Sequence, residues 1–169
     1  MRGAPSRVTV RPMSQRKFLV VADDTDEYQA ALRFACRRAR STGGHVAILR
    51  VIEPAVFEHW SGVREEIERQ ARAEAEAVVQ ASADYVLAET GLPPEYLIVH
   101  ADNVRAALKQ VIGEDPDIKI LVLAAAVGRH GPGPLVASLA KEGVQWGARK
   151  VPVTLVPGDL TDAEIADLA

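Results

Sequence analysis

The stretch IKILVLAAAVGRHGPGPLV, residues 118–136, decides the fold class of this chain. Its first part, Ile118–Ala126, is almost entirely apolar, which is typical of a strand covered on both faces. The segment that follows, Val127–Pro134, is rich in glycine and proline and is called the glycine-rich loop below. Leu135 then opens an amphipathic stretch that predicts a helix to about Gly147. A buried strand that leads through a loop into a helix is the building unit of a parallel α/β domain.

The rest of the chain shows the same alternation of short apolar runs and longer amphipathic stretches. The apolar runs predict further strands at 18–22, 45–52, 96–99 and 151–156. The amphipathic stretches predict helices from Thr25 or Asp26 to 41, at 63–90, at 104–112 and, as a short tail, at 162–168. We expect helix caps at Thr25 or Asp26, at Asn103, and at Thr161 with Glu164. This order predicts an α/β, doubly wound, five-stranded parallel sheet with helices on both faces.

We expect three segments along the chain. Residues 1–15 form a flexible N-terminal arm, 16–158 form the α/β domain, and 159–169 form a C-terminal tail helix. The arm is basic but has no apolar centre, so it is not a secretory signal. Met13 is a second candidate start, because the residues after it lead directly into the first strand. An arm added by a misplaced gene start and a functional basic arm look alike in the sequence, and both interpretations stay open.

Composition excludes several classes of function. Among 169 residues the formal net charge is −3, so there is no basic excess of the kind that binds nucleic acid. No apolar run approaches the roughly 18 residues of a membrane span. The single cysteine, Cys36, excludes an internal disulfide and is expected to be an inert packed thiol in a helix. We therefore expect a cytoplasmic protein that binds neither membranes nor nucleic acid.

The glycine-rich loop is the first candidate site. Gly128, Gly131 and Gly133 let backbone amides approach an anion closely, and the start of the next helix adds its dipole. Arg129 and His130 could add positive charge. No Gly-Lys-Ser/Thr follows, so this is not a Walker A loop. The alternative is a tight turn that needs glycine and proline for its geometry alone.

Acidic residues after the first strand form the second candidate site. Asp23 and Asp24 could accept hydrogen bonds from a ribose or a base, or hold a metal ion. The alternative is helix capping, which would account for one of them and leave Asp24 as the ligand residue. Two aromatic residues and a histidine follow the second strand and either line the same site or cover the edge of the core; they are Phe57, His59 and Trp60.

Signatures of catalysis are scarce. No serine stands in a nucleophile elbow, and the four histidines lack the spacing of metal ligands. His100 and His130 both follow strands and are the one candidate pair for acid–base chemistry. We therefore predict no metal site and no catalytic residue, and expect a binding protein rather than an enzyme.

Four segments together resemble the universal stress protein family. The first strand and turn, 20–27, resembles the opening strand of that family, which ends in an aspartate before a small polar pair. Residues 48–53, 121–124 and 151–156 resemble its later strands. Two further segments resemble a subgroup common in alphaproteobacteria; they are Gly131–Val136 and Val156–Leu160. The resemblance extends over about 16–169.

The resemblance implies a fold, a ligand and an assembly. The family has a sheet of order 3-2-1-4-5, similar to adenine nucleotide alpha hydrolases, and often forms homodimers through its last strand, here Val151–Val156. Many members bind ATP or AMP through Gly, two residues, Gly, nine residues, Gly, then Ser or Thr. Gly128 and Gly131 match the first two glycines. Asp24 matches an acidic residue near the adenosine, and Val51 matches a backbone contact to the base.

The end of that motif is missing from this chain. Lys141 and Glu142 stand where glycine and a hydroxyl residue belong, and a glutamate there repels phosphate. Ser138 is a candidate replacement as a donor to phosphate. The first function in view is therefore a stress-response or regulatory protein that binds ATP or AMP. The alternatives are a dimeric interaction module without nucleotide, and a nucleotide hydrolase that uses His100, His130 and Arg129. Fold class does not choose between them.

Overall fold

The computed structural model describes residues 15–54 and 61–169. The expectations for the N-terminal arm up to residue 14, for Met13, and for Phe57, His59 and Trp60 lie outside these residues. The described elements follow each other in this order: β1 Lys17–Val21, α1 Tyr28–Thr42, β2 His45–Ile52, α2 Ser61–Thr90, β3 Glu95–His100, α3 Val104–Glu114, β4 Ile118–Ala125, α4 Pro134–Glu142, β5 Gln145–Trp146, β6 Arg149–Lys150, β7 Val153–Pro157 and α5 Asp162–Leu168.

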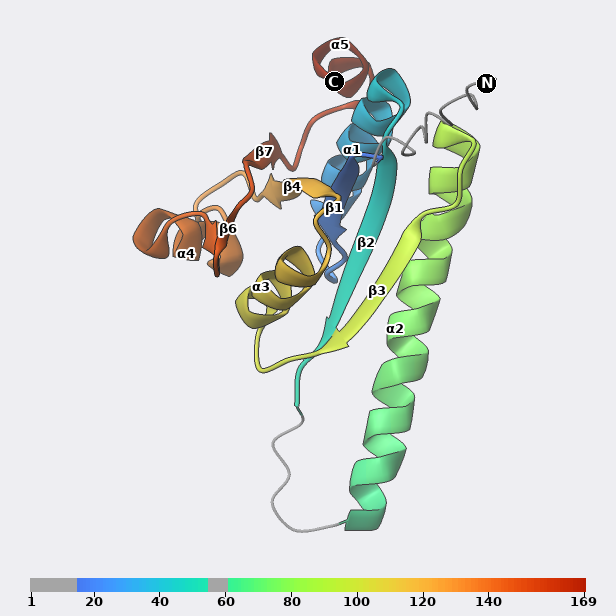
Figure 1. The fold of residues 1–169 in the computed structure, drawn as a ribbon, viewed down its shortest axis with the longest axis vertical. Helices are drawn as coiled ribbons and strands as arrows, with labels where there is room; N and C mark the ends of the chain where they lie inside the picture. The colour runs from blue at the N-terminus through green and yellow to red at the C-terminus, as the bar shows by residue number, and fades with distance from the viewer. Residues whose placement is uncertain (1–14, 55–60) are drawn as a thin grey trace, which may run out of the picture.

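Five of the strands form one parallel sheet of order β3-β2-β1-β4-β7 (Figure 1). The register places Val20 beside Ile48 of β2 on one side and beside Val122 of β4 on the other. The chain therefore starts in the middle of the sheet, moves outward to β3, and then crosses to the other half. This confirms the predicted doubly wound α/β fold and its strand order. The order reverses between β1 and β4, which is where such sheets bind ligands.

The alternating side chains of β1 divide between two cores, one on each face of the sheet. Phe18 and Val20 pack into a core with α1, α2 and α5. Leu19 and Val21 face the other core, which contains residues of α3 and α4 and the fully buried Trp146 of β5. Burial on both faces explains why these strands are almost continuously apolar in the sequence.

The start of α1 differs from the prediction. The helix begins at Tyr28, and its N-cap residue Glu27 makes no capping hydrogen bond with its side chain. Thr25 and Asp26 precede the helix, so the expectation that one of them caps it is wrong. Asp23 instead stabilises the turn, since it accepts hydrogen bonds from the backbone N–H of Thr25, at 3.0 Å, and from its hydroxyl. Such a turn satisfies the backbone locally.

The region after the glycine-rich loop also differs from the prediction. Helix α4 ends at Glu142 instead of continuing to about Gly147, and Gly143 follows it with φ 77° and ψ −177°. The strand β5 lies within the predicted helix, and its antiparallel partner β6 lies between that helix and the predicted strand at 151–156. The last strand of the sheet is Val153–Pro157, two residues later than expected at its start. The predicted caps at Asn103 and at Thr161 with Glu164 are confirmed.

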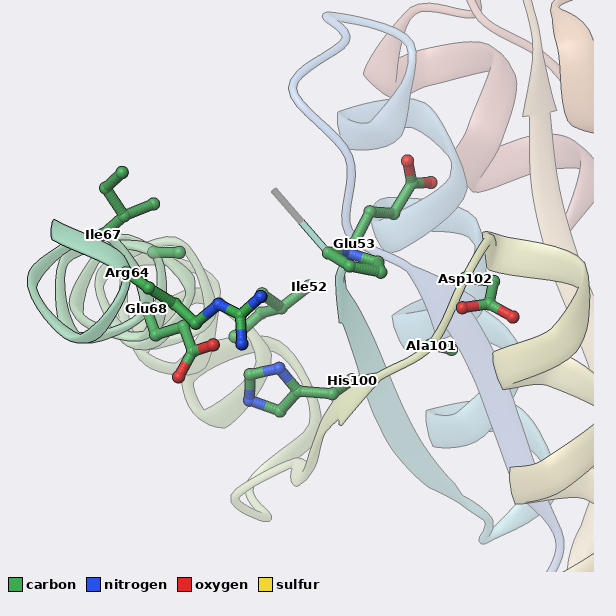
Figure 2. A pocket seen from close by; sticks show the side chains of 10 residues that line it. Ile52, Glu53, Arg64, Ile67, Glu68, His100, Ala101 and Asp102 are labelled. Carbon is green, nitrogen blue, oxygen red and sulfur yellow. The ribbon is translucent and has the colours of Figure 1, made fainter. Parts of the chain in front are cut away.

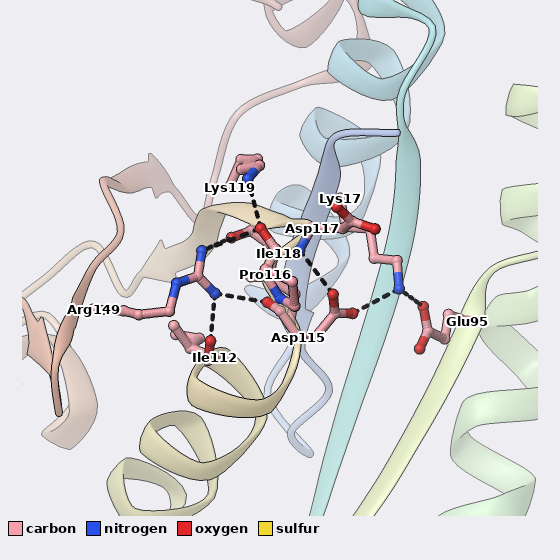
Figure 3. A network of polar contacts seen from close by, with 9 residues as sticks. All are labelled: Lys17, Glu95, Ile112, Asp115, Pro116, Asp117, Ile118, Lys119 and Arg149. Carbon is pink, nitrogen blue, oxygen red and sulfur yellow. Dashed lines mark hydrogen bonds and ion pairs between the residues drawn. The ribbon is translucent and has the colours of Figure 1, made fainter. Parts of the chain in front are cut away.

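A polar network ties the amino edge of the sheet together (Figure 3). The ammonium group of Lys17 lies 2.5 Å from a carboxylate oxygen of Glu95 and 2.6 Å from one of Asp115. Burial alone disfavours the charged lysine, but its hydrogen bonds to Asp115 and Glu95 raise the pKa of Lys17 above its ordinary value. Arg149 of β6 donates to backbone carbonyls at the end of α3 and the start of β4. The network lies at the opposite edge of the sheet from the carboxyl ends of the strands, where α/β sheets bind ligands.

Two further residues lie where the sequence placed them. Cys36 is buried in α1, and burial raises the pKa of its thiol to about 12, so the sulfur stays protonated at neutral pH. His45 begins β2 and its side chain contacts Gln15. In the described part of the chain, no helix is both long and apolar enough to cross a membrane.

Candidate functional site

The carboxyl ends of β1 and β4 border a cleft of about 290 Å³ at the point where strand order reverses. We call it the glycine-loop cleft, because the glycine-rich loop and the start of α4 form one wall. Val21, Leu123 and Ala124 form its floor at the ends of the two strands. The remaining lining residues come from the turn after β1 and from three helices and their loops; they are Asp23, Thr25, Glu27, Tyr28, Ala31, Val104, Ala126, Pro132, Gly133, Pro134, Leu135 and Val136.

Most of this lining is apolar, and its charged groups are acidic. Asp23 and Glu27 are the only charged residues among the described residues of the lining, and none is Lys or Arg. The backbone turn at Asp23 holds its carboxylate beside the hydroxyl of Thr25. An apolar slot with a few convergent polar groups at one end is the usual form of a small-molecule site.

Tyr28 forms part of the cleft wall and was not expected from the sequence. Its hydroxyl group donates a hydrogen bond to Ser82 of α2 at 2.9 Å, and Ser82 in turn donates to the carbonyl of Val78. Burial raises the pKa of Tyr28 to about 12, so its hydroxyl remains a neutral donor. In the sequence, the feature that could have pointed to Tyr28 was its position in the first turn of an amphipathic helix. That signal indicates burial but does not indicate a cleft.

Asp24 is not part of the described lining of this cleft. It lies beside a second hollow between α1 and α2, and its carboxylate pairs with Arg50 of β2 at 3.1 Å. Arg50 also donates to the carbonyl of Ala22 at 3.1 Å. Asp23 lines both the glycine-loop cleft and this second hollow, whereas Asp24 lines the second hollow and pairs with Arg50.

The three glycines of the loop all have positive φ. The φ angles are 137° at Gly128, 78° at Gly131 and 94° at Gly133. A Cβ atom at these positions would meet no described atom within 4 Å, so the need for glycine is conformational and not steric. Gly133 lines the cleft, whereas Gly128 and Gly131 shape the loop beside it.

Arg129 and His130 are exposed on the outer part of the glycine-rich loop. Neither belongs to the described lining of the cleft. His100 lies at the end of β3, in a different hollow of about 420 Å³ between the sheet and α2. Figure 2 shows His100 facing Arg64 and Glu68, which extend toward it from α2. The structure does not bring His100 and His130 together in one described cleft, so the candidate acid–base pair has no geometric support.

Ser138 and Glu142 lie on α4 and border a fourth hollow, of about 520 Å³, between α3 and α4. We call it the α3–α4 cleft. It meets the glycine-loop cleft at three shared lining residues, Val104, Pro134 and Leu135. The hydroxyl of Ser138 donates to the carbonyl of Leu135 at 2.8 Å, so its proton is used within its own helix.

Glu142 is held by Arg105 of α3. The Nε atom of Arg105 lies 3.0 Å from a carboxylate oxygen of Glu142, and its Nη2 donates to the carbonyl of Gly143 at 3.0 Å. The guanidinium group also lies over the ring of Trp146, 5.3 Å from its centre, in a cation–π contact. Sequence reasoning did not single out Arg105, because its partners are far away along the chain.

Val51 lies in β2 opposite Val99 of β3, and its side chain packs partly buried against the core that contains Leu49. It is not among the described lining residues of any of these hollows. No group of three or more His, Cys, Asp or Glu residues in the described segments could hold a metal ion.

Comparisons with known proteins agree with this architecture. The universal stress protein family model matches residues 15–157. No curated protein sequence matches the chain. Among solved structures, universal stress protein UspA from Lactobacillus plantarum is similar with a TM-score of 0.67 and 17% identity, covering 83% of this chain and 97% of that one.

Similar structures include universal stress proteins that were solved with a bound nucleotide. The universal stress protein from Archaeoglobus fulgidus in complex with dAMP has a TM-score of 0.55 and 18% identity, covering 85% of this chain and 99% of that one. A universal stress protein family protein from Arabidopsis thaliana with AMP bound has a TM-score of 0.52 and 16% identity, covering 84% and 91%. At these identities the likeness shows the fold alone.

Proposed function

Because the chain belongs to the universal stress protein family, we propose that it binds an adenine nucleotide, ATP or AMP, in the glycine-loop cleft. Its role would be that of a cytoplasmic stress-response or regulatory protein, and its resemblance to the alphaproteobacterial subgroup is part of this proposal. The observation that supports the proposal most is the position of this cleft. It lies at the reversal of strand order, with apolar walls and the start of a helix at one end.

The walls of the cleft suit a flat purine. Leu123, Val136 and Ala31 offer apolar surface, and about 290 Å³ lies at the small end of the range for ligand pockets. The ribose has hydroxyl groups that a carboxylate such as Asp23 accepts well. In nucleotide-binding sheets an acidic side chain commonly holds the ribose in this way.

The start of α4 suits a phosphate group. The first N–H groups of a helix have no partner inside it, and Pro134 at the first position supplies none, so Leu135 and Val136 offer the free donors. Gly133 gives the ligand close access to this backbone. Arg129, exposed on the glycine-rich loop, is the permanent cation within that loop. We propose that Gly128, Gly131 and His130 contribute through the shape and the polarity of the loop.

Asp23 and Asp24 provide a direct test of where the ligand lies. We expect Asp23→Asn to weaken AMP and ATP binding about tenfold, because it removes the negative charge beside the cleft and replaces one acceptor oxygen by an NH2 donor. Asp24→Asn removes the same charge one residue away, at the contact with Arg50, and should change affinity less than threefold. The measurement is calorimetric titration of protein freed of co-purified nucleotide. The reverse order of effects would assign the ligand to Asp24, the residue that the resemblance indicated.

The same titration tests the function itself. We expect AMP or ATP to bind with a dissociation constant in the micromolar to submillimolar range. We also expect adenine nucleotide in the supernatant after freshly purified protein is denatured. Absence of binding at millimolar concentration of both would reject the proposal. It would favour the alternative function, a dimeric interaction module that has lost nucleotide binding.

We also propose that the chain forms a homodimer through β7. Within the described chain, β7 pairs only with β4, so its outer edge is unpaired. Leu155 in this strand is 48% exposed, and Val127, in the loop after β4, is 62% exposed. An unpaired edge with exposed apolar side chains is normally covered by another chain or protected by charge.

A further inference from the structure

We infer that Arg105 is a positioning residue of the glycine-loop cleft. It holds the carboxyl end of α4, and the other end of the same helix forms part of the cleft wall. The effect of this contact on ligand affinity rests on the proposed function, whereas its effect on the position of α4 does not.

Helix α4 has few buried contacts of its own. Of its nine residues, all of which the structure describes, only Leu139 is buried, and Leu135 and Val136 pack partly buried against the same core. A glycine with positive φ stands at each end, Gly133 with φ 94° and Gly143 with φ 77°. Because an isolated helix of this length is at best marginally stable in water, tertiary contacts must fix its position.

Arg105 contacts the carboxyl end of α4 at two points. Its Nε atom lies 3.0 Å from a carboxylate oxygen of Glu142, and its Nη2 donates to the carbonyl of Gly143 at 3.0 Å. A cation at this end also interacts favourably with the helix dipole. Arg105 itself lies in the first turn of α3, a helix anchored by the fully buried Leu108 and Ile112. The contact therefore ties a lightly buried helix to a firmly packed one.

The surroundings of Arg105 make it depend on Glu142. The Arg105 side chain is only 14% exposed, and its guanidinium group lies over the ring of the fully buried Trp146. Its Nε and Nη1 atoms make no hydrogen bond among the residues that the structure describes, so the attraction between Nε and Glu142 is ionic. Loss of the carboxylate would leave a largely buried cation without a counter-charge, which is strongly unfavourable. We expect the guanidinium group then to leave this position and release the end of α4.

Release of one end of α4 affects the cleft at the other end. At about 1.5 Å per residue the helix is roughly 13 Å long and moves as one short rod. Glu142 borders the α3–α4 cleft, while Pro134, Leu135 and Val136 line the glycine-loop cleft. A tilt of α4 about Gly133 therefore displaces this wall of the glycine-loop cleft and leaves the sheet beneath it in place.

The test combines local hydrogen exchange with ligand affinity. We expect Arg105→Gln and Glu142→Gln each to raise amide exchange in residues 135–143 about tenfold or more, with exchange in α1 and β1 unchanged. Each should also weaken AMP binding about fivefold in calorimetric titration. The double variant should lose the same factor of about five and not about twenty-five, because both substitutions break one contact. The matched control is Glu76→Gln, which breaks an exposed pair with Arg72 on α2 and should change neither quantity.

Glu142→Gln alters a side chain that is 58% exposed, so it keeps the test decisive if Arg105→Gln does not fold. Unchanged exchange of α4 in a folded variant, or faster exchange with unchanged AMP affinity, would overturn the inference. A rise of exchange in all segments would also overturn it, since it would show a contribution to global stability alone. If the wild-type protein binds neither AMP nor ATP, the proposed function is rejected, and hydrogen exchange alone decides whether Arg105 fixes α4.

Discussion

Gly133 is the residue whose backbone conformation is most demanding at the cleft. Its φ of 94° and ψ of 158° lie in a region that residues with a Cβ atom almost never occupy. It is the N-cap residue of α4 and lines the cleft, so its conformation sets the direction in which the helix leaves the loop. A glycine at this position therefore affects both the stability of the folded protein and the shape of the glycine-loop cleft.

Replacing Gly133 tests this demand. We expect Gly133→Ala to lower the free energy of unfolding by about 1–3 kcal/mol and to weaken nucleotide binding, because alanine strains the loop. Gly113→Ala is the matched control: Gly113 lies in α3 without positive φ, and both added methyl groups enter open space within the described structure. The control should be neutral or stabilising by up to about 1 kcal/mol in urea denaturation. Equal effects of the two substitutions would contradict the conformational explanation.

At the scale of secondary-structure elements, Arg149 connects β6 to the end of α3 and the start of β4. From β6 its guanidinium group donates to the carbonyls of Ile112, Asp115, Pro116 and Ile118 (Figure 3). The first two are carbonyls at the carboxyl end of α3, which the helix itself leaves without partners. The short β5–β6 pair is thus fixed to α3 by Arg149, and by Trp146, which is fully buried in the core on that face.

Lysine cannot reproduce this contact, because it has one donor group and not a planar fork. We expect Arg149→Lys to lower the free energy of unfolding by about 1.5–3 kcal/mol, since several partly buried carbonyls lose a charged donor. Arg37→Lys, at an exposed position of α1, makes the same chemical change and should be close to neutral. Urea denaturation of the two variants measures the free energy of unfolding. An equal loss in both would show that the planar guanidinium group of Arg149 does not contribute to stability.

At the scale of the whole molecule, Lys17 and Asp115 connect the strands of one half of the sheet to the loop before β4. Burial opposes ionisation of Asp115, but hydrogen bonds from the ammonium group of Lys17 and from the N–H of Asp117 lower its pKa below the ordinary value. A carboxyl group with a lowered pKa stabilises the folded state above its unfolded-state pKa. That contribution disappears as the pH falls through the lowered folded-state pKa.

This linkage predicts an acid-dependent loss of stability. Asp115→Asn should be less stable than the wild type at pH 6 to 7, and the difference should shrink as the pH falls below about 4. Thermal or urea unfolding across pH 3 to 7 measures it. Asp84→Asn, at an exposed position of α2, is the control and should give a pH profile parallel to that of the wild type. A difference between the Asp115 variant and wild type that stays constant with pH would contradict the linkage.

The proposed homodimer through β7 also concerns the whole molecule. Leu155→Arg places a charge on the exposed edge strand, where a second copy would pair, and should shift the protein from dimer to monomer. Light scattering after size-exclusion chromatography measures the mass. Leu87→Arg is the control, because Leu87 is equally exposed, at 47%, but lies on α2. A wild-type monomer, or a Leu155→Arg variant that remains dimeric, would reject this interface.

Much of this architecture was predictable from local sequence. Runs such as 18–22 and 118–126 are almost continuously apolar, which is typical of parallel strands that are covered on both faces. Asn103 and the pair Thr161 and Glu164 were predicted correctly as caps, because capping depends on residues three positions apart. The glycine-rich loop follows β4, and it lies at the carboxyl edge because the strands of a parallel sheet all end there.

The tertiary structure decided what the loop faces. Asp23 and Asp24 are adjacent in the sequence, yet one borders the cleft and the other pairs with Arg50, 26 residues away along the chain. Glu142 appeared in the sequence as an unpaired charge in a phosphate motif, and Arg105 of another helix is its partner. The sequence by itself determined the alternation of strands and helices, because periodicity and caps are local. The charge inside the site depended on contacts between distant segments, which no local pattern contains.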